Sequence, residues 1–294
     1  MKEFLGEKVF VVAEMSANHR QDFGMAVDII HAAYESGADA VKVQMFKPDS
    51  LTLNSDLPIF KFTTGPWSGM KLYELYEKAC MPYNWVPKLK NLADEIGIKF
   101  FTTVYDTEAV EIAEALEIEA YKIASFEATE YDLIERVAQT MKPLFISAGS
   151  AGFTKLAKTK EVVYEYHDKV AFLKCTSAYP ATLGSLNLRT LLDMRRNLSP
   201  FVGLSDHTTG IVAPVVAVAM GARVIEKHLT ISDDTLDAGF SVTPDRFKTM
   251  VETIRAAEEA MGRVFYGGKS VLDRMEINGK SVRIVKDETN NTIV

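Results

Sequence analysis

Eight short apolar segments alternate with longer amphipathic segments along most of the chain. The short segments predict β-strands at Val9–Ala13, Ala40–Gln44, Lys99–Thr103, Ala120–Ile123, Leu144–Ser147, Val170–Cys175, Phe201–Leu204 and Val224–Lys227. The segments between them place apolar residues three and four positions apart, which predicts helices such as Met25–Glu35, Trp85–Glu95, Thr107–Glu117, Tyr131–Thr140 and Asp245–Met261. Strands that are apolar almost throughout are typical of a parallel sheet covered by helices. Eight repeats favour a closed (β/α)8 TIM barrel over an open doubly wound sheet, and no GxGxxG motif follows the first strand.

The composition limits the partners of such a barrel. A length of 294 residues suits one barrel, and 47% hydrophobic with 25% charged residues is typical of a globular protein. The formal net charge of -7 argues against nucleic acid and anionic membranes, which bind basic surfaces. No apolar run reaches the roughly 18 residues that span a bilayer, and the N-terminus lacks the apolar core of a signal peptide. Because Cys80 and Cys175 lie in no motif, we expect both to be reduced core thiols in a cytoplasmic protein.

Two segments depart from the strand–helix repeat. Asn54–Tyr83 is a long insertion after the second predicted strand. A long loop at the catalytic end of a barrel is usually a lid or a substrate wall. The segment over residues 263–294 is too short for a second domain. We therefore expect a TIM-barrel catalytic domain over residues 1–262 and a C-terminal tail over 263–294.

Two of the five histidines follow successive predicted strands. Ser205-Asp206-His207 ends one strand, and Lys227-His228 ends the next, with one crossover helix between them. The carboxyl ends of parallel strands form the edge at which ligands bind. The spacing therefore predicts a divalent-metal site at the mouth of the barrel, with His207 and His228 as ligands.

Two lysines, Lys42 and Lys122, lie inside otherwise apolar strands. A buried lysine is costly unless an anion or a carboxylate compensates its charge. Serine and threonine residues end several of the same strands. The pattern therefore predicts a pocket for anionic groups such as a phosphate and a carboxylate.

Six motifs resemble those of the sialic acid synthase family. They are AEMSANH at 13–19, GADAVKVQMFKPDSLTL at 37–53, YKIASFE at 121–127, LKCTSAYP at 173–180, GLSDHT at 203–208 and VIEKHLT at 224–230. Three further features are most similar to the pseudaminic acid synthase branch: GPWSGMKLYELYEKACMPYNW at 65–85, the Ser in CTSAYP, and FSVTPDRF at 240–247. The motifs run in order from about residue 8 to 262, so together they are far more specific than any one of them.

The resemblance implies roles for individual residues. His207 and His228 match the metal-binding histidines of a site usually occupied by Mn2+, with Co2+, Mg2+, Fe2+ or Zn2+ as alternatives. The positions that hold phosphoenolpyruvate match Lys42, Lys122, Ser125, Ser147, Ser177 and Ser205. Other substrate contacts are expected from Tyr179 and Asn18. The acidic residues assigned to sugar binding, proton transfer or positioning of water and metal match Glu14, Glu127 and Asp237, which we expect to be catalytic.

The family's reaction is a condensation of phosphoenolpyruvate with an amino-sugar aldehyde, such as a 2,4-diacetamido hexose or an N-acetylmannosamine-like sugar. Carbon 3 of phosphoenolpyruvate attacks the aldehyde, water adds at carbon 2, and phosphate leaves. The product is a nonulosonic acid such as pseudaminic or sialic acid. A metal ion would polarise the aldehyde oxygen, and Lys42 and Lys122 would neutralise the substrate anion. Glu127 is the candidate to activate the water or to stabilise the positive charge that develops at carbon 2.

The chain is expected to depart from the family after the barrel. Family members continue into a small antifreeze-like β domain that reaches across a dimer, and we expect this chain to lack it. A homodimer, a separate protein or the Asn54–Tyr83 insertion would then complete the sugar pocket. Two alternatives stay open. One is condensation with a smaller aldose or aldose phosphate, which a basic cluster at the acceptor end would favour, and the other is a barrel without activity that acts as a partner or regulatory protein in nonulosonate biosynthesis.

Overall fold

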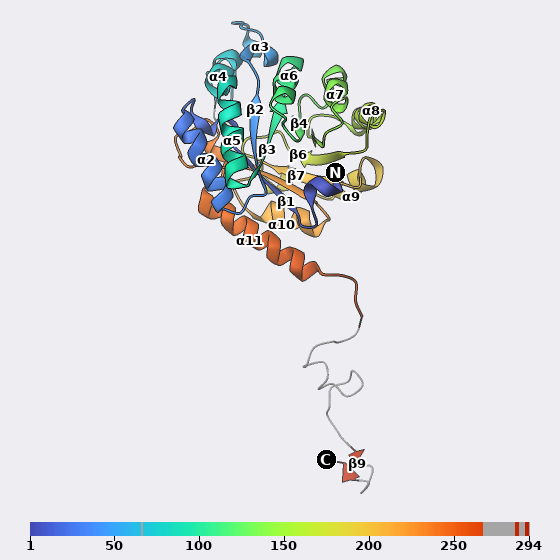
Figure 1. Ribbon diagram of the computed structural model, residues 1–294. Coiled ribbons are helices and arrows are strands. Elements are labelled where there is room, and N and C mark those ends of the chain that lie inside the picture. Colours follow the sequence, from blue (N-terminus) through green and yellow to red (C-terminus); the bar gives the residue numbers. More distant parts are fainter. Residues whose placement is uncertain (66, 267–285, 288–291, 294) are drawn as a thin grey trace. The chain divides into compact units, whose positions relative to one another are not determined.

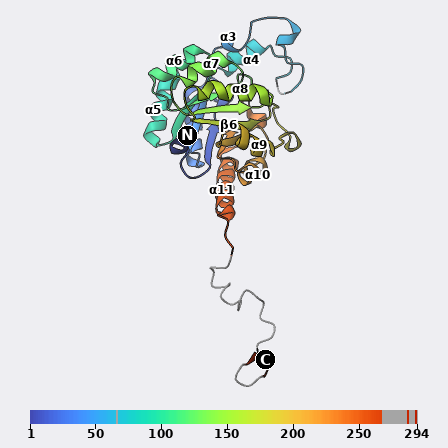
Figure 2. The ribbon, with the colours of Figure 1, turned by 90° about the vertical axis from the view of Figure 1, so that its right-hand side faces the viewer.

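Eight parallel strands close into a barrel whose outer face is covered by helices (Figures 1 and 2). The computed structural model describes residues 1–65, 67–266, 286–287 and 292–293. The barrel strands are β1 (Phe10–Glu14), β2 (Ala40–Met45), β3 (Lys99–Val104), β4 (Tyr121–Ile123), β5 (Leu144–Ala148), β6 (Val170–Cys175), β7 (Val202–Asp206) and β8 (Val224–His228). The predicted (β/α)8 barrel is confirmed. The largest difference is at β7, which continues to Asp206 because Asp206 pairs with Lys227 of β8.

The helices that follow the strands lie around the barrel. They are α2 (Phe23–Glu35), α5 (Val86–Ile96), α6 (Thr107–Ala115), α7 (Tyr131–Ala138), α8 (Phe153–Tyr164), α9 (Thr190–Asn197), α10 (Val212–Ala219) and α11 (Pro244–Met261). Aspartate side chains cap two of them, since Asp22 accepts the amide of Met25 in α2 and Asp106 accepts that of Ala109 in α6. These caps begin the helices at the turns that follow β1 and β3. In the described part of the chain, no helix is long and apolar enough to cross a membrane.

The strands are buried on both faces, and alternate residues serve different purposes. On β7 and β8, Ser205 and Glu226 point into the barrel. Their neighbours Asp206 and Lys227 face away from the cavity and form a fully buried ion pair of 2.6 Å. Because of this alternation, the Asp206–Lys227 ion pair is enclosed in the protein, whereas Glu226 is available to a ligand in the cavity.

The two ends of the barrel are built differently. At the amino ends of the strands, the short helix α1 (Lys2–Leu5) places Phe4 against Phe10 and Phe145, with ring centroids 5.4 and 6.0 Å apart. At the opposite end lie α3 (Pro48–Leu51) and α4 (Leu72–Ala79), which belong to the chain between β2 and α5 (Figure 1). The aromatic side chains of Phe4, Phe10 and Phe145 thus close the amino end of the barrel. The chain between β2 and α5 surrounds the carboxyl end.

The chain forms two compact units, Met1–Ala260, which holds the barrel, and Met261–Val294. In the second unit, β9 (Lys286–Asp287) pairs antiparallel with β10 (Thr292–Ile293). Most of the tail predicted over 263–294 lies outside the described residues. Both cysteines are free thiols; Cys175 is buried, whereas Cys80 is half-exposed and not a core residue.

Candidate active site

A cavity of about 550 Å³ lies at the carboxyl ends of the barrel strands. Its lining includes every site residue predicted from the sequence except Asn18: Glu14, Lys42, Lys122, Ser125, Glu127, Ser147, Ser177, Tyr179, Ser205, His207, His228 and Asp237. Strand register explains this convergence, because Glu14 of β1 lies beside Lys42 of β2 on one side and His228 of β8 on the other. Residues from distant parts of the sequence therefore meet at one level of the barrel.

Two lysines and two carboxylates form a buried network at the base of the cavity. Lys42 pairs with Glu14, donates to Thr103 Oγ1 at 2.7 Å and lies 3.8 Å from Glu226 Oε2. Lys122 donates to Glu226 Oε1 at 3.2 Å. The sequence required an anion or a carboxylate to compensate the lysines, and carboxylates of the protein do so. An anionic ligand would have to compete with these carboxylates or join them, and the predicted pocket for a phosphate and a carboxylate stays a prediction.

Glu226 is the site residue that the sequence prediction missed. It is buried between Lys122 and Ser205, whose hydroxyl donates to Glu226 Oε1 at 3.0 Å. Burial alone would raise the pKa of this carboxyl, but the ammonium groups of Lys122 and Lys42 lower it to about 2. The signal was present in the sequence, because Glu226 precedes His228 by two residues and a strand has a period of two.

A serine cluster lies beside the lysines. Ser125 Oγ and Ser177 Oγ are 2.9 Å apart, and the amide of Ser150 donates to Ser125 Oγ at 3.0 Å. The hydroxyl of Ser147 is buried without a hydrogen-bond partner in the described structure. A Cβ at Gly149 would collide with both Ser125 Oγ and Ser177 Oγ, so a side chain at this position would displace the cluster. The cluster offers hydroxyl groups next to a cation, which is a suitable arrangement for a phosphate or carboxylate.

The two histidines lie next to each other in the cavity lining, edge to face, with ring centroids 5.3 Å apart and an interplanar angle of 70°. His207 Nδ1 is 2.9 Å from the carbonyl oxygen of Thr176, which orients the ring and leaves Nε2 as the other donor atom. His228 Nδ1 is buried without a hydrogen-bond partner and lies 3.8 Å from Asp237 Oδ2. Burial first, then His207 and the nearby lysines, hold the pKa of His228 well below its usual range, so the ring is neutral.

This donor set fits a divalent ion that keeps several positions open. Neutral imidazole is a ligand for Mn2+, Co2+, Fe2+ and Zn2+, and the unpaired Nδ1 of His228 is a donor without another purpose in the structure. Among the described residues, no group of three or more His, Cys, Asp or Glu side chains is arranged to hold a metal. An ion at this place would be held by the two imidazoles, with water or substrate to complete its coordination.

Glu127 and Asp237 supply two further carboxyl groups to the cavity. Burial raises the pKa of Glu127 to about 7, and its Oε2 has no hydrogen-bond partner within the described structure. Burial also raises the pKa of Asp237, although the amide of Ala17 donates to its Oδ2 at 3.3 Å. A carboxyl group whose pKa lies near neutrality can accept and release protons under physiological conditions.

An apolar wall of the cavity comes mostly from the insertion Asn54–Tyr83. Its lining side chains are Phe62, Trp67, Leu72, Leu75 and Tyr76 of the insertion, together with Leu51 of α3. Trp67 joins this wall to the rest of the site, since its indole donates to Leu236 O at 3.1 Å and its ring lies 5.7 Å from that of Tyr179. Tyr179 in turn packs on His207 with ring centroids 4.5 Å apart. The predicted role of the insertion as a substrate wall agrees with this geometry.

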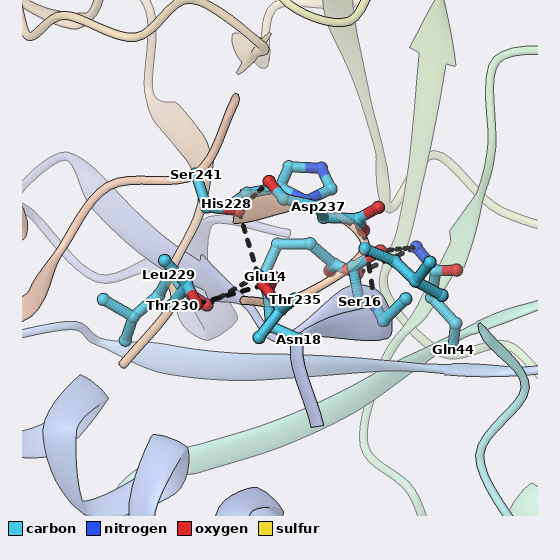
Figure 3. A network of polar contacts seen from close by, with 12 residues as sticks. Glu14, Ser16, Asn18, Gln44, His228, Leu229, Thr230, Thr235, Asp237 and Ser241 are labelled. Atoms are coloured by element: carbon cyan, nitrogen blue, oxygen red, sulfur yellow. Dashed lines mark hydrogen bonds and ion pairs between the residues drawn. The ribbon is translucent and has the colours of Figure 1, made fainter. Parts of the chain in front are cut away.

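Asn18, predicted to contact substrate, lies outside the cavity lining. It belongs to η1 (Ser16–His19) and is fully buried. Its side chain is bonded to Leu229, Thr235 and Ser241, three residues of the chain that follows β8 (Figure 3). The donors and the acceptor of the Asn18 side chain are thus used within the protein, and its contact with substrate stays a prediction.

Comparisons with known proteins identify the family of the chain. The NeuB family profile matches residues 29–266. The pseudaminic acid synthase of Campylobacter jejuni is 43% identical over 277 residues, which cover 93% of this chain and 80% of that protein. The pseudaminic acid synthase of Helicobacter pylori is 37% identical over 284 residues, which cover 94% of this chain and 83% of that protein.

Solved structures agree on the fold. The crystal structure of N-acetylneuraminic acid (sialic acid) synthetase from Leptospira borgpetersenii, in complex with citrate, superposes with a TM-score of 0.83 at 24% identity. The match covers 92% of this chain and 91% of that one. The resemblance drawn from the motifs is confirmed, and the chain belongs to the NeuB family.

Proposed function

We propose that this enzyme joins carbon 3 of phosphoenolpyruvate to the aldehyde carbon of an N-acylated amino sugar and releases phosphate and a nonulosonic acid. The observation that carries the proposal is a cavity that holds two lysines, two carboxylates and a serine cluster at its base, two adjacent histidines and an apolar wall. Its relatives in Campylobacter jejuni and Helicobacter pylori are named pseudaminic acid synthases, which favours a 2,4-diacetamido hexose as the sugar.

The base of the cavity suits phosphoenolpyruvate. Lys122 and Lys42 supply two positive charges, which Glu14 and Glu226 partly compensate, and the hydroxyl groups of Ser125, Ser147 and Ser177 line the same cavity. A trianionic substrate needs such charge, because desolvating it without partners is costly. Held by these groups, carbon 3 would be directed toward the histidines, where the aldehyde binds.

The histidine side of the cavity suits the aldehyde. A divalent ion held by His207 and His228 would supply Lewis-acid polarisation of the aldehyde oxygen. Asp237, 3.8 Å from His228, would orient a hydroxyl group of the sugar or a water molecule at the same place. Tyr179 packs on His207 and limits the space in which the aldehyde can lie.

Glu127 is placed to activate water. After the new carbon–carbon bond forms, positive charge develops at carbon 2, and Glu127 would accept the proton of the water that adds there. The tetrahedral phosphate ester then breaks its carbon–oxygen bond and releases phosphate, leaving the 2-keto acid. The base must be ionised for this step, and burial raises the pKa of Glu127 to about 7.

We therefore expect kcat/KM to rise with pH as Glu127 ionises near pH 7, because the deprotonated carboxylate is the active form. Replacing Glu127 by glutamine should remove this rising limb of the plot of kcat/KM against pH and lower kcat about 100-fold or more. The measurement is phosphate release over pH 5.5–9. The exposed neighbour Glu130 provides the control, and Glu130→Gln should keep kcat and shift the limb slightly downward. An unchanged limb in Glu127→Gln would assign the base to another residue.

The apolar wall favours an acylated sugar over a sugar phosphate. Hydroxyl or phosphate groups packed against Leu72, Leu75 and Phe62 would lose their hydrogen bonds to water, whereas acetamido methyl groups would be buried favourably. In the described part of the chain, the lysines that line the cavity are Lys42 and Lys122, and both belong to its base. The basic cluster that an aldose phosphate would require is therefore not found among the described lining residues.

Replacing Leu72 by asparagine should weaken this selectivity. We expect the ratio of kcat/KM for a 2,4-diacetamido aldose to that for the matching 2-acetamido-4-hydroxy aldose to fall about tenfold. Leu57→Asn is the matched control, because Leu57 belongs to the same insertion, is 62% exposed and does not line the cavity. An equal change in both variants would mean that the wall does not read the acyl group.

The test of the proposed function is direct. Purified protein is incubated with Mn2+, phosphoenolpyruvate and each candidate aldose, and both phosphate and the 2-keto acid are measured. Equal amounts of the two products with an N-acylated aldose would support the proposal. No product with any hexosamine, in protein shown to bind the metal, would favour a binding or regulatory barrel instead.

A further inference from the structure

We propose that Asn18 is a positioning residue that clamps the loop between β8 and α11 and thereby holds Asp237 in the active site. This loop, residues 229–243, is called the β8–α11 loop below. The proposal rests on the proposed function only in taking Asp237 as a group that serves the reaction. Asn18 itself lies outside the substrate cavity and acts on the reaction only through Asp237.

The contacts of Asn18 reach three separate points of the β8–α11 loop (Figure 3). Its Nδ2 donates to the carbonyl oxygen of Leu229 at the start of the loop and to Ser241 Oγ near the end, both at 2.9 Å. Its Oδ1 accepts from Thr235 Oγ1 in the middle at 2.5 Å. One buried side chain thus ties together positions twelve residues apart, and it does so from the other end of the sequence.

An amide is the side chain that can make all three bonds. It offers two N–H groups and a carbonyl acceptor on one rigid plane, and the two donated bonds and the accepted bond use both kinds. A carboxylate at this position would face the carbonyl oxygen of Leu229 with no hydrogen to donate. A leucine of similar shape would leave buried polar groups on the loop unpaired, which is costly.

The clamp reaches Asp237 by two short routes. Ser241 Oγ, which accepts from Asn18, donates to the carbonyl oxygen of Asp237 at 2.7 Å. On the other side, the amide of Ala17, adjacent to Asn18, donates to Asp237 Oδ2 at 3.3 Å. Both the backbone and the carboxylate of Asp237 are therefore held by the segment that contains Asn18.

The same segment is conformationally strained, which is consistent with an imposed geometry. Ser16 has φ 46°, in the left-handed region that residues with a side chain rarely adopt. Its hydroxyl accepts from Gln44 Nε2 at 3.2 Å, and Gln44 also donates to Glu14 at 2.9 Å. The clamp thus connects the Asp237 loop to the carboxylate that pairs with Lys42.

A second tether of the β8–α11 loop provides a control. Arg20 and Asp234 form an ion pair of 2.9 Å on the surface, with side chains that are 47% and 78% exposed. Exposed pairs of this kind contribute little to stability. Arg20→Ala therefore removes a contact with the same loop, in the same region of sequence, without breaking the buried clamp.

The experiment compares Asn18→Asp, Thr235→Val and Ser241→Ala with Arg20→Ala in the full-length protein. We expect the three clamp variants to lower kcat/KM by about tenfold or more, equivalent to the loss of a buried hydrogen bond. Arg20→Ala should change it by less than about twofold. In an Asp237→Asn background, Asn18→Asp should cost less than about a further twofold, because both changes act through the same group.

If Asn18 had a purely structural role, the clamp variants would lower the melting temperature but leave kcat/KM of the folded protein unchanged. Independent losses from Asn18→Asp and Asp237→Asn, or full activity in Asp237→Asn alone, would overturn the proposal.

Hydrogen–deuterium exchange gives a readout that does not need turnover. Amides of residues 229–243 should exchange faster in the clamp variants, while those of β2 to β6 should not change. If the wild-type protein makes no product, the proposed function fails, and unchanged exchange would separately disprove the clamp. Thr235→Val and Ser241→Ala keep the test decisive if Asn18→Asp does not fold.

Discussion

Replacing Glu226 by glutamine is expected to lower the free energy of unfolding by about 3 kcal/mol and to abolish measurable turnover. The isosteric change removes the carboxylate that lies between Lys122 and Lys42, at 3.2 and 3.8 Å, and leaves both ammonium groups buried beside Glu14 alone. An unpaired buried charge costs far more than a lost surface pair, so the folded state should bear most of the penalty. The reaction should also fail, because the displaced lysines would no longer present their charges at the same place.

Urea unfolding and phosphate release measure the two effects. Glu108→Gln is the matched control, because Glu108 pairs with Lys47 at 2.6 Å with both side chains about half-exposed. That change should cost less than about 1 kcal/mol and leave turnover intact. If Glu226→Gln were as stable as the wild-type protein, the network would contribute no net stabilisation, and the lysines would have to be compensated in another way.

The same carboxylate predicts how stability depends on pH. The pKa of Glu226 is about 2 in the folded protein, below its usual value of 4.5. A group whose pKa is depressed by folding stabilises the protein above its usual pKa, and this stabilisation is lost as the pH falls through the folded value. The difference in unfolding free energy between wild type and Glu226→Gln should therefore be constant above about pH 5 and shrink from pH 4.5 toward pH 2.

The fold was predictable because its signal is local and repeated. Each strand of the barrel is a short apolar run, and two of the helices begin at a capping aspartate, Asp22 or Asp106. A barrel strand buried on both faces is apolar almost throughout, so an ionisable residue within it stands out. Lys42 and Lys122 were found in this way, and the cavity contains both.

The remaining differences arise from contacts that cross the sequence. Glu226 is one ionisable residue among three in Val-Ile-Glu-Lys-His, and burial of the strand alone does not tell which of Glu226 and Lys227 points inward. The strand alternation, counted back from His228, places Glu226 on the inward face, and this signal was overlooked. Asn18 could not be resolved from its neighbours, because its partners lie 211, 217 and 223 positions away. A polar residue next to a predicted site is as consistent with a clamp as with a ligand contact, and only the geometry of the loop distinguishes them.

Removal of either cavity histidine is expected to abolish metal binding and to lower kcat by about 1,000-fold or more, the scale of losing an electrostatic contribution of several kcal/mol. His207 is oriented by the carbonyl oxygen of Thr176 at 2.9 Å, and His228 keeps its buried Nδ1 free. Because few protein donors are available, alanine at either position leaves a single imidazole, which cannot retain a divalent ion against water.

Titration calorimetry with Mn2+ on chelator-treated protein measures binding independently of turnover. One ion should bind per wild-type chain, and none should bind to His207→Ala or His228→Ala at the same concentrations. His31→Ala is the control, because His31 lies on α2, outside the cavity lining, and this variant should preserve both binding and turnover.

Unreduced turnover in the presence of excess chelator would show that the histidines act without a metal. In that case His207 and His228 would have to polarise the aldehyde as hydrogen-bond donors. A neutral His228, whose pKa is held low mainly by burial and then by His207, is better suited to binding a cation than to donating a charged hydrogen bond, so the metal is the outcome that its environment favours.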